Sequence, residues 1–220
     1  YKENEGKYPI PILRALNFLE ICKRKTIYIG KDELIVGERG PHPKAVSTFP
    51  ELTCHSVEDL HVLNTRELQR YTISQEDIDT YEREVIPYWK GRTQRERIFN
   101  HVPKEWKEAY EAGMFTEFME QRAPGHTSLD GKVYQYGMLD LKERIAHELR
   151  NLDFMNDPEA TDKQEELTAM SISCDAAIIF AERHAELAEK MAGRETDPKR
   201  KKELKKIAEI CRWVPAHAPR

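Results

Sequence analysis

Apolar residues that recur every three or four positions between residues 167 and 191 constrain the fold more than any other feature of this chain. Such spacing places side chains on one face of an α-helix. The pattern predicts one long helix whose buried face consists of Leu167, Met170, Cys174, Ile178, Ala181, His184, Ala188 and Met191. Because His184 lies on this face, we expect it to be a core residue with satisfied ring nitrogens.

Start and stop signals predict further helices. Asp197 followed by Pro198 is an N-cap with proline at the first helical position, which opens a helix to about Cys211. A second helix covers residues 12–22, where apolar side chains form a one-sided stripe. The chain is therefore expected to be mostly α-helical.

A third start signal lies near the middle of the chain. Ser74 and Asp77 resemble a capping box, so a helix should begin there. We expect this helix to end at about Ile86, because Pro87 cannot continue it.

Minor β structure is expected near the N-terminus. Residues 26–29 and 33–37 are short runs of β-branched and other apolar residues, and Gly30-Lys31-Asp32 between them is typical of a tight turn. These runs could pair as a hairpin. The proline-containing stretch 37–53 that follows is expected to be an ordered loop.

The charge balance argues against a nucleic-acid or membrane partner. The chain has 35 basic and 39 acidic residues and a net charge of −4, so it lacks a broad basic surface. The basic run 199–206 is expected to be a solvated helix face. No stretch has the apolar length of a membrane span.

Cysteine spacing argues against a metal site. Cys22, Cys54, Cys174 and Cys211 are far apart, whereas zinc and iron–sulfur ligation need clustered thiolates. Dispersed thiols are typical of a reducing, cytoplasmic location. The neighbours Cys54 and His55 point in different directions, so we do not expect a catalytic dyad.

One segment has features of a site. Residues 110–123 continue a helical pattern that breaks at Pro124-Gly125, which places His126 on a loop after the helix. A histidine there can donate, accept or relay a proton near neutral pH. The alternative is that His126 only binds a free backbone carbonyl at the helix end.

Four segments resemble the N-terminal region of the pyruvate formate-lyase-like glycyl radical enzymes. They are Ile12-Leu13-Arg14-Ala15-Leu16, residues 32–37 (DELIVG), residues 112–127 (AGMFTEFMEQRAPGHT) and Val214-Pro215-Ala216-His217. Their order and approximate spacing match the family. The resemblance implies that residues 1–220 are the N-terminal helical part of a ten-stranded α/β barrel.

The resemblance also implies partners and a cofactor. In the family, an activating enzyme that uses S-adenosylmethionine installs a radical on a glycine, and a cysteine then relays it to the substrate. Neither the cysteine loop nor the glycine loop of the family occurs in these residues, so no catalytic residue, metal or bound cofactor is assigned to them. We expect the 220 residues alone to be inactive, and the longer parent protein to be a cytoplasmic homodimer.

The substrate class follows from the third segment. Within the family, it is similar to the pocket segment of the trans-4-hydroxy-L-proline dehydratases, which makes Phe118 and His126 the expected substrate-binding residues. A dehydratase of a small hydroxylated molecule is therefore the expected activity. The alternatives are another glycyl radical enzyme, such as a glycerol or propanediol dehydratase or an arylacetate decarboxylase, and a non-catalytic helical interaction module.

Overall fold

The computed structural model describes residues 1–38, 40–45, 48–115 and 130–220. These residues form two compact units, one from residues 1–38 and 129–220 and the other from residues 39–128. Within the described residues the secondary structure is helical, with no strand. None of the described helices combines the length and the apolar character needed to cross a membrane.

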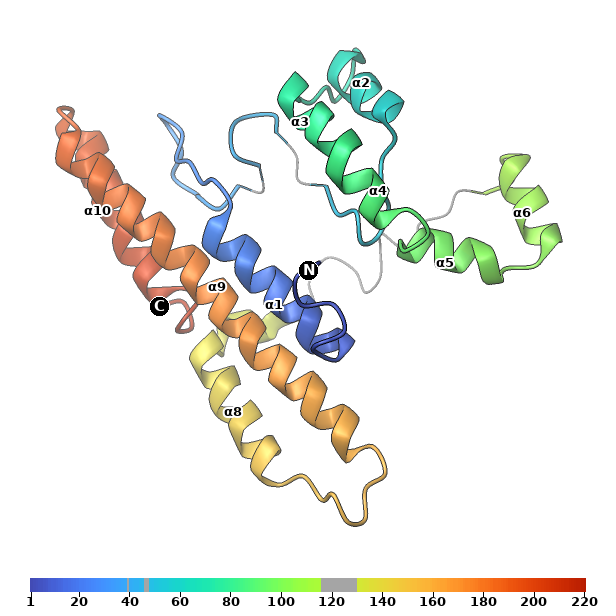
Figure 1. The fold of residues 1–220 in the computed structure, drawn as a ribbon. Helices are drawn as coiled ribbons and strands as arrows, with labels where there is room; N and C mark the ends of the chain where they lie inside the picture. Colours follow the sequence, from blue (N-terminus) through green and yellow to red (C-terminus); the bar gives the residue numbers. More distant parts are fainter. Residues whose placement is uncertain (39, 46–47, 116–129) are drawn as a thin grey trace. The chain divides into compact units, whose positions relative to one another are not determined.

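The first unit is organised around one long helix, α9 (Ala160–Arg194). Three helices, α1 (Ile10–Arg24), α8 (Met138–Arg150) and α10 (Pro198–Trp213), lie along it (Figure 1). A short 3₁₀ helix, η2 (Asp130–Tyr134), precedes α8. The predicted long helix and the helix after Asp197-Pro198 are both confirmed.

Small side chains bring these helices close together. Most of the buried positions of α9 are alanines, and an alanine face lets neighbouring backbones approach. The core cluster of the unit joins α9, α10 and the segment after α1, and consists of Ile29, Ala185, Ala188, Ala192, Leu204, Ile207 and Ala208. Along the predicted face, Cys174, His184 and Ala188 are buried, whereas Met170 is 53% exposed.

The expected hairpin is not formed. The turn at residues 30–33 exists, with the Glu33 amide 3.4 Å from the Gly30 carbonyl oxygen, but the flanking runs do not pair as strands. Ile29 instead enters the helical core, and Val36 packs against it. Burial against α9 and α10 therefore replaces strand pairing, and the prediction of minor β structure is wrong for the described residues.

The second unit contains short helices. Its core cluster is formed by Leu60, Ile78 and Tyr81. Its elements in chain order are α2 (Val57–Thr65), α3 (Gln75–Thr80), the π-helix η1 (Tyr81–Val85), α4 (Ile86–Trp89), α5 (Gln94–His101) and α6 (Lys104–Glu111).

Pro87 does not end the helix that Ser74 begins. The Ser74 hydroxyl accepts from the Asp77 amide as predicted, but helical structure continues to Trp89. The change to π-helix just before Pro87 explains the difference, because the Ile86 amide donates to the Tyr81 carbonyl five residues earlier. This wider turn accommodates a proline that an unbroken α-helix would exclude.

Residues 215 and 216, after α10, bind the start of α8. The amides of Met138 and Leu139, which begin α8, donate to the carbonyls of Pro215 and Ala216 at 2.8 and 3.0 Å. These bonds satisfy amide groups that have no partner inside the helix. Gly137 permits the contact, because a Cβ there would overlap the backbone of Ala216 and His217.

We therefore expect Gly137→Ala to lower the free energy of unfolding by about 1–3 kcal/mol, as overpacking does in well-packed sites. Urea denaturation measures this change. The matched control is Gly193→Ala, because Gly193 lies in α9 with open space around its Cβ position. Alanine should leave stability unchanged there or raise it by up to about 1 kcal/mol through helix propensity. Equal effects of the two substitutions would contradict the docking of residues 215–217 on α8.

Candidate functional site

The two predicted substrate-binding residues, Phe118 and His126, lie outside the described residues. Their role therefore stays a prediction. What the structure provides is the framework on both sides of their segment along the chain, together with a polar cluster in the first unit.

An aromatic cluster anchors the chain immediately before this segment. The Phe115 ring lies 4.8 Å from the Trp106 ring, and Trp106 and Tyr110 of α6 stack at 5.9 Å. The Arg95 guanidinium lies over the Phe99 ring at 4.3 Å and donates to the Tyr110 hydroxyl at 2.9 Å. Aromatic and cation–π contacts of this geometry add to area burial. The last described residue before 116 is thus firmly held.

On the other side of the segment, Gly137 and the docked C-terminal residues fix the start of α8. Along the chain, residues 116–129 therefore follow the aromatic cluster around Trp106. They precede η2 and the start of α8, whose first amides are bonded to residues 215 and 216.

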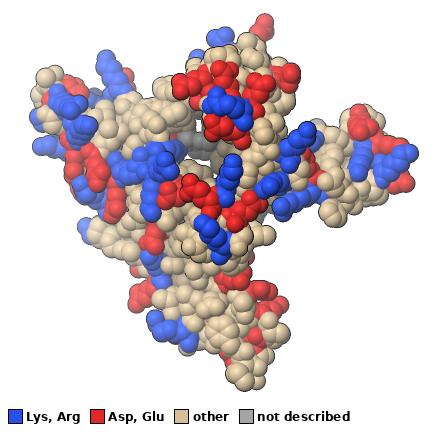
Figure 2. Space-filling view, in the orientation of Figure 1, with Lys and Arg blue, Asp and Glu red and all other residues tan. Residues whose placement is uncertain are grey.

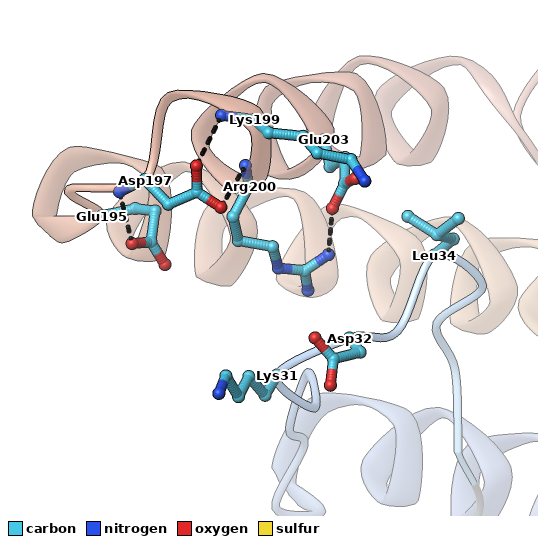
Figure 3. Close-up of a pocket in the computed structure, with 8 residues that line it drawn as sticks. All are labelled: Lys31, Asp32, Leu34, Glu195, Asp197, Lys199, Arg200 and Glu203. Carbon is cyan, nitrogen blue, oxygen red and sulfur yellow. Dashed lines mark hydrogen bonds and ion pairs between the residues drawn. The ribbon is translucent and has the colours of Figure 1, made fainter.

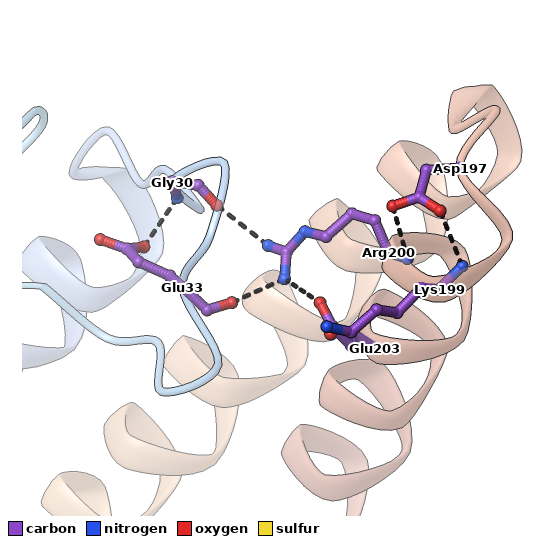
Figure 4. A network of polar contacts seen from close by, with 6 residues as sticks. All are labelled: Gly30, Glu33, Asp197, Lys199, Arg200 and Glu203. Carbon is purple, nitrogen blue, oxygen red and sulfur yellow. Dashed lines mark hydrogen bonds and ion pairs between the residues drawn. The ribbon is translucent and has the colours of Figure 1, made fainter.

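Arg200 lies at the centre of the polar cluster in the first unit. Its guanidinium donates to the carbonyls of Gly30 and Glu33, both at 2.9 Å, and pairs with the Glu203 carboxylate at 3.1 Å (Figure 4). The Glu33 carboxylate in turn accepts from the Gly30 amide at 2.7 Å. The turn at residues 30–33 is therefore held through three backbone groups, the Gly30 amide and the carbonyls of Gly30 and Glu33.

This finding corrects the expectation that all of residues 199–206 form a solvated face. Arg200 is only 7% exposed, whereas Lys199, Lys202, Lys205 and Lys206 are exposed as predicted. Arg200 precedes Leu204 by one helical turn and so lies on the buried face of α10. That spacing was the signal in the sequence that could have identified it. Burial of an arginine is tolerated here because its donors are bonded.

Arg183 of α9 binds the backbone in the same way, closer to the end of α1. It donates to the carbonyls of Cys22 and Lys25 at 2.5 and 2.7 Å. The last carbonyls of a helix lack partners inside it and carry partial negative charge, so a cation is well placed there. Two arginines thus bind the backbone from residue 22 to residue 33.

A hollow of about 340 Å³ lies beside this turn (Figure 3). Its lining is mostly charged: Lys31, Asp32, Leu34, Glu195, Asp197, Lys199, Arg200 and Glu203. Several of these groups are already engaged, since Asp197 caps α10 through the Lys199 and Arg200 amides and Glu203 pairs with Arg200. Figure 2 likewise shows basic and acidic side chains interspersed on the visible face rather than a field of one sign.

His184 is buried as predicted, at 2% exposed, but it is only half satisfied. Its Nδ1 donates to the Phe180 carbonyl at 2.8 Å, while Nε2 has no hydrogen-bond partner among the described residues. Burial lowers the pKa of His184, because the charged imidazolium is disfavoured away from water. The neutral ring suits a packing role, and nothing links it to a site.

The cysteines are not activated. Burial raises the pKa of each of the four thiols, which disfavours the reactive thiolate. The Cys54 thiol faces the Tyr81 hydroxyl at 3.8 Å, and the His55 ring lies 4.0 Å from Asp59, so the two form no dyad. No cluster of histidine, cysteine and acidic residues suited to a metal occurs in the described part of the chain.

The bonds from Arg200 to the turn can be tested by substitution. We expect Arg200→Lys to lower the free energy of unfolding by about 1–3 kcal/mol, because a lysine cannot bond both carbonyls in the same fork and leaves a buried acceptor without a donor. Urea denaturation is the measurement.

The matched control is Arg212→Lys on the same helix. Arg212 pairs with Glu189 at 2.7 Å, but both side chains are about half exposed, so replacing the arginine with lysine should change the free energy of unfolding little. If Arg200→Lys costs no more than this control, the bonds to the turn contribute little to stability.

Comparison with known proteins assigns the chain to a family. The model of the pyruvate formate lyase-like family matches residues 1–220. The chain is 49% identical over 219 residues to trans-4-hydroxy-L-proline dehydratase of Clostridioides difficile, and 33% identical over 232 residues to isethionate sulfite-lyase of Nitratidesulfovibrio vulgaris. Each match covers all of this chain and 28% of the relative.

Solved structures agree. The crystal structure of the Clostridioides difficile hydroxyproline dehydratase with trans-4-hydroxy-L-proline bound matches with a TM-score of 0.92, over 100% of this chain and 28% of that one. The glycerol-bound B12-independent glycerol dehydratase of Clostridium butyricum matches with a TM-score of 0.86 at 32% identity, over 99% and 28%. The resemblance expected from the four sequence segments is therefore confirmed, and the chain belongs to the pyruvate formate lyase-like family.

Proposed function

We propose that these 220 residues are the N-terminal part of a glycyl radical dehydratase that removes water from a small hydroxylated molecule, with trans-4-hydroxy-L-proline as the substrate. The observation that carries the proposal is the 49% identity to a trans-4-hydroxy-L-proline dehydratase along the whole chain, against 33% to a sulfite-lyase. The TM-score of 0.92 to a hydroxyproline dehydratase supports it.

In this proposal, residues 1–220 are a helical part of a longer chain that contains the ten-stranded barrel. The chain spans 28% of the length of its relatives, which supports a larger protein. The cysteine that forms the thiyl radical and the glycine that stores the radical belong to that further region. An activating enzyme that uses S-adenosylmethionine installs the glycyl radical, and the whole protein acts as a cytoplasmic homodimer.

The four cysteines of these residues support the assignment of the radical-forming cysteine to the further region. Each of the four cysteines is buried or half-buried, and burial raises its pKa. A thiol that must relay a radical to substrate has to face the substrate. None of these four is therefore assigned the catalytic role.

Phe118 and His126 contact the substrate in this proposal. Phe118 supplies an apolar wall that excludes water from reactive intermediates. His126 bonds a substrate oxygen and, in its protonated form, gives a proton to the departing hydroxide so that it leaves as water. Along the chain, this segment follows Phe115, which packs on Trp106 in the second unit, and precedes the start of α8, which is bonded to residues 215–216 in the first unit.

We expect His126→Gln in the full-length protein to lower turnover by about 10²–10⁴-fold, the usual contribution of general acid assistance. Radical content, measured by electron paramagnetic resonance after activation, should stay near wild type, because in this proposal the radical glycine lies in the further region of the longer chain. Phe118→Ala should mainly raise KM. The assay is anaerobic dehydration of trans-4-hydroxy-L-proline.

The matched control is His147→Gln, the same substitution at an exposed histidine of α8. It should leave both turnover and radical content unchanged. Turnover of the His126 variant within about twofold of wild type at normal radical content would show that His126 only caps a helix end and has no role in the chemistry.

A further inference from the structure

His184 of α9 is buried, at 2% exposed, and its two ring nitrogens differ. Nδ1 donates to the Phe180 carbonyl, so the neutral ring carries its proton there and leaves Nε2 as an acceptor. Nε2 has no hydrogen-bond partner among the described residues. A second proton would have to bind Nε2, where the new N–H group would be buried without an acceptor.

Two cations lie close to this ring, and both are held in place. Arg183 donates to two backbone carbonyls at the end of α1. The Lys25 ammonium donates to the Glu38 carbonyl at 3.1 Å and lies 4.9 Å from the centroid of the Phe180 ring. That ring packs edge-on against His184, with the ring centroids 4.6 Å apart. Neither cation can move away from a charged imidazole without breaking its bonds to the backbone.

The other titratable groups near His184 do not offset these cations in the described part of the chain. The Cys22 thiol of α1 and the Cys211 thiol of α10 stay neutral, because burial raises the pKa of both. The Glu38 carboxylate acts on Lys25. A protonated His184 would therefore add a third positive charge to a buried site.

These contacts set the direction of the pH effect. Burial lowers the pKa of His184, and the charges of Arg183 and Lys25 lower it further, while the Nδ1 bond opposes this shift without cancelling it. In an opened chain the ring titrates near pH 6.5. The packed state is therefore fully stable above about pH 6.5 and loses stability as the pH falls from there toward the lower pKa of the packed ring.

We propose that His184 makes the packing of the end of α1 and residues 25–38 on α9 acid-sensitive, so that protonation of the ring opens this part of the unit. It is a conformational device of the fold and does not rest on the proposed function. The neutral ring permits close packing, and the charged ring requires water that reaches it only in the opened state.

Residues 25–38 are the part of these surroundings that opens most readily. Residues 26–38 contain no helix or strand, and regions with few hydrogen bonds of their own open at the lowest free energy. The bond from Arg183 to the Lys25 carbonyl attaches them to α9 beside His184. The bonds of Arg200 join the turn to α10 and do not involve α9.

The test measures the maleimide reaction of the Cys22 thiol in the full-length protein, for wild type and for His184→Leu, which cannot titrate. Cys22 is 5% exposed at this site, so the reagent reaches it only when the packing opens. The ratio of the wild-type rate to the variant rate should rise about tenfold from about pH 7.5 to about pH 5.5, because opening is favoured tenfold for each pH unit below about 6.5. The pH dependence of the thiol itself cancels in this ratio.

Two controls distinguish this effect from others, with the labelled thiols located by peptide mass spectrometry. His147→Leu, at an exposed histidine of α8, should react like wild type at both pH values. The buried Cys174 thiol, about 15 Å from His184 along α9, should show no comparable rise.

A Cys22 ratio that does not change with pH would overturn the proposal. An equal rise at Cys174 would overturn it as well, because acid would then unfold the whole unit. If the leucine variant does not fold, His184→Gln, which is also neutral, should give the same tenfold rise. Neither readout depends on substrate or radical, so a failed test of His126 and a failed test of His184 are distinguishable.

Discussion

The fold of the first unit depends on arginine side chains that bind backbone carbonyls of the segment leaving α1. Arg183 bonds Cys22 and Lys25, and Arg200 bonds Gly30 and Glu33. Without them, the carbonyls at the end of α1 and in the turn would need another donor, because the neighbouring runs form no strand. These bonds supply donors to four carbonyls on the two sides of Ile29, which enters the core between α9 and α10.

Elsewhere in this unit, irregular segments are also held to helices by hydrogen bonds to backbone groups. Carbonyls of Pro215 and Ala216 satisfy the first amides of α8, as the arginines satisfy carbonyls after α1. Irregular segments are thus bound to helices through backbone groups, while the alanine face of α9 sets the spacing between helices. In the second unit, aromatic packing around Trp106 holds the chain just before the proposed substrate segment.

The sequence was most informative where one local rule decided the outcome. The periodicity of residues 167–191 and the Asp197-Pro198 start signal predict α9 and α10, and both are observed. Predictions failed where tertiary packing decided, since residues 26–29 and 33–37 have β propensity but bury Ile29 and Val36 against helices. The burial of Arg200 was not predicted, because the basic residues around it indicate a solvated face. Its spacing of one helical turn from Leu204 places it on the buried face of α10. The break at Pro124-Gly125 singled out His126 as a candidate, whereas its predicted contact with substrate, and the prediction of Phe118, came only from the family resemblance.

We propose that these helices belong to a glycyl radical dehydratase. The most direct measurement is electron paramagnetic resonance of the full-length protein after anoxic activation with its activating enzyme and S-adenosylmethionine, followed by addition of trans-4-hydroxy-L-proline. We expect an organic radical doublet and consumption of the amino acid with loss of one water per molecule. A protein that forms no radical, or one that forms the radical but leaves trans-4-hydroxy-L-proline intact while converting glycerol, would contradict the account.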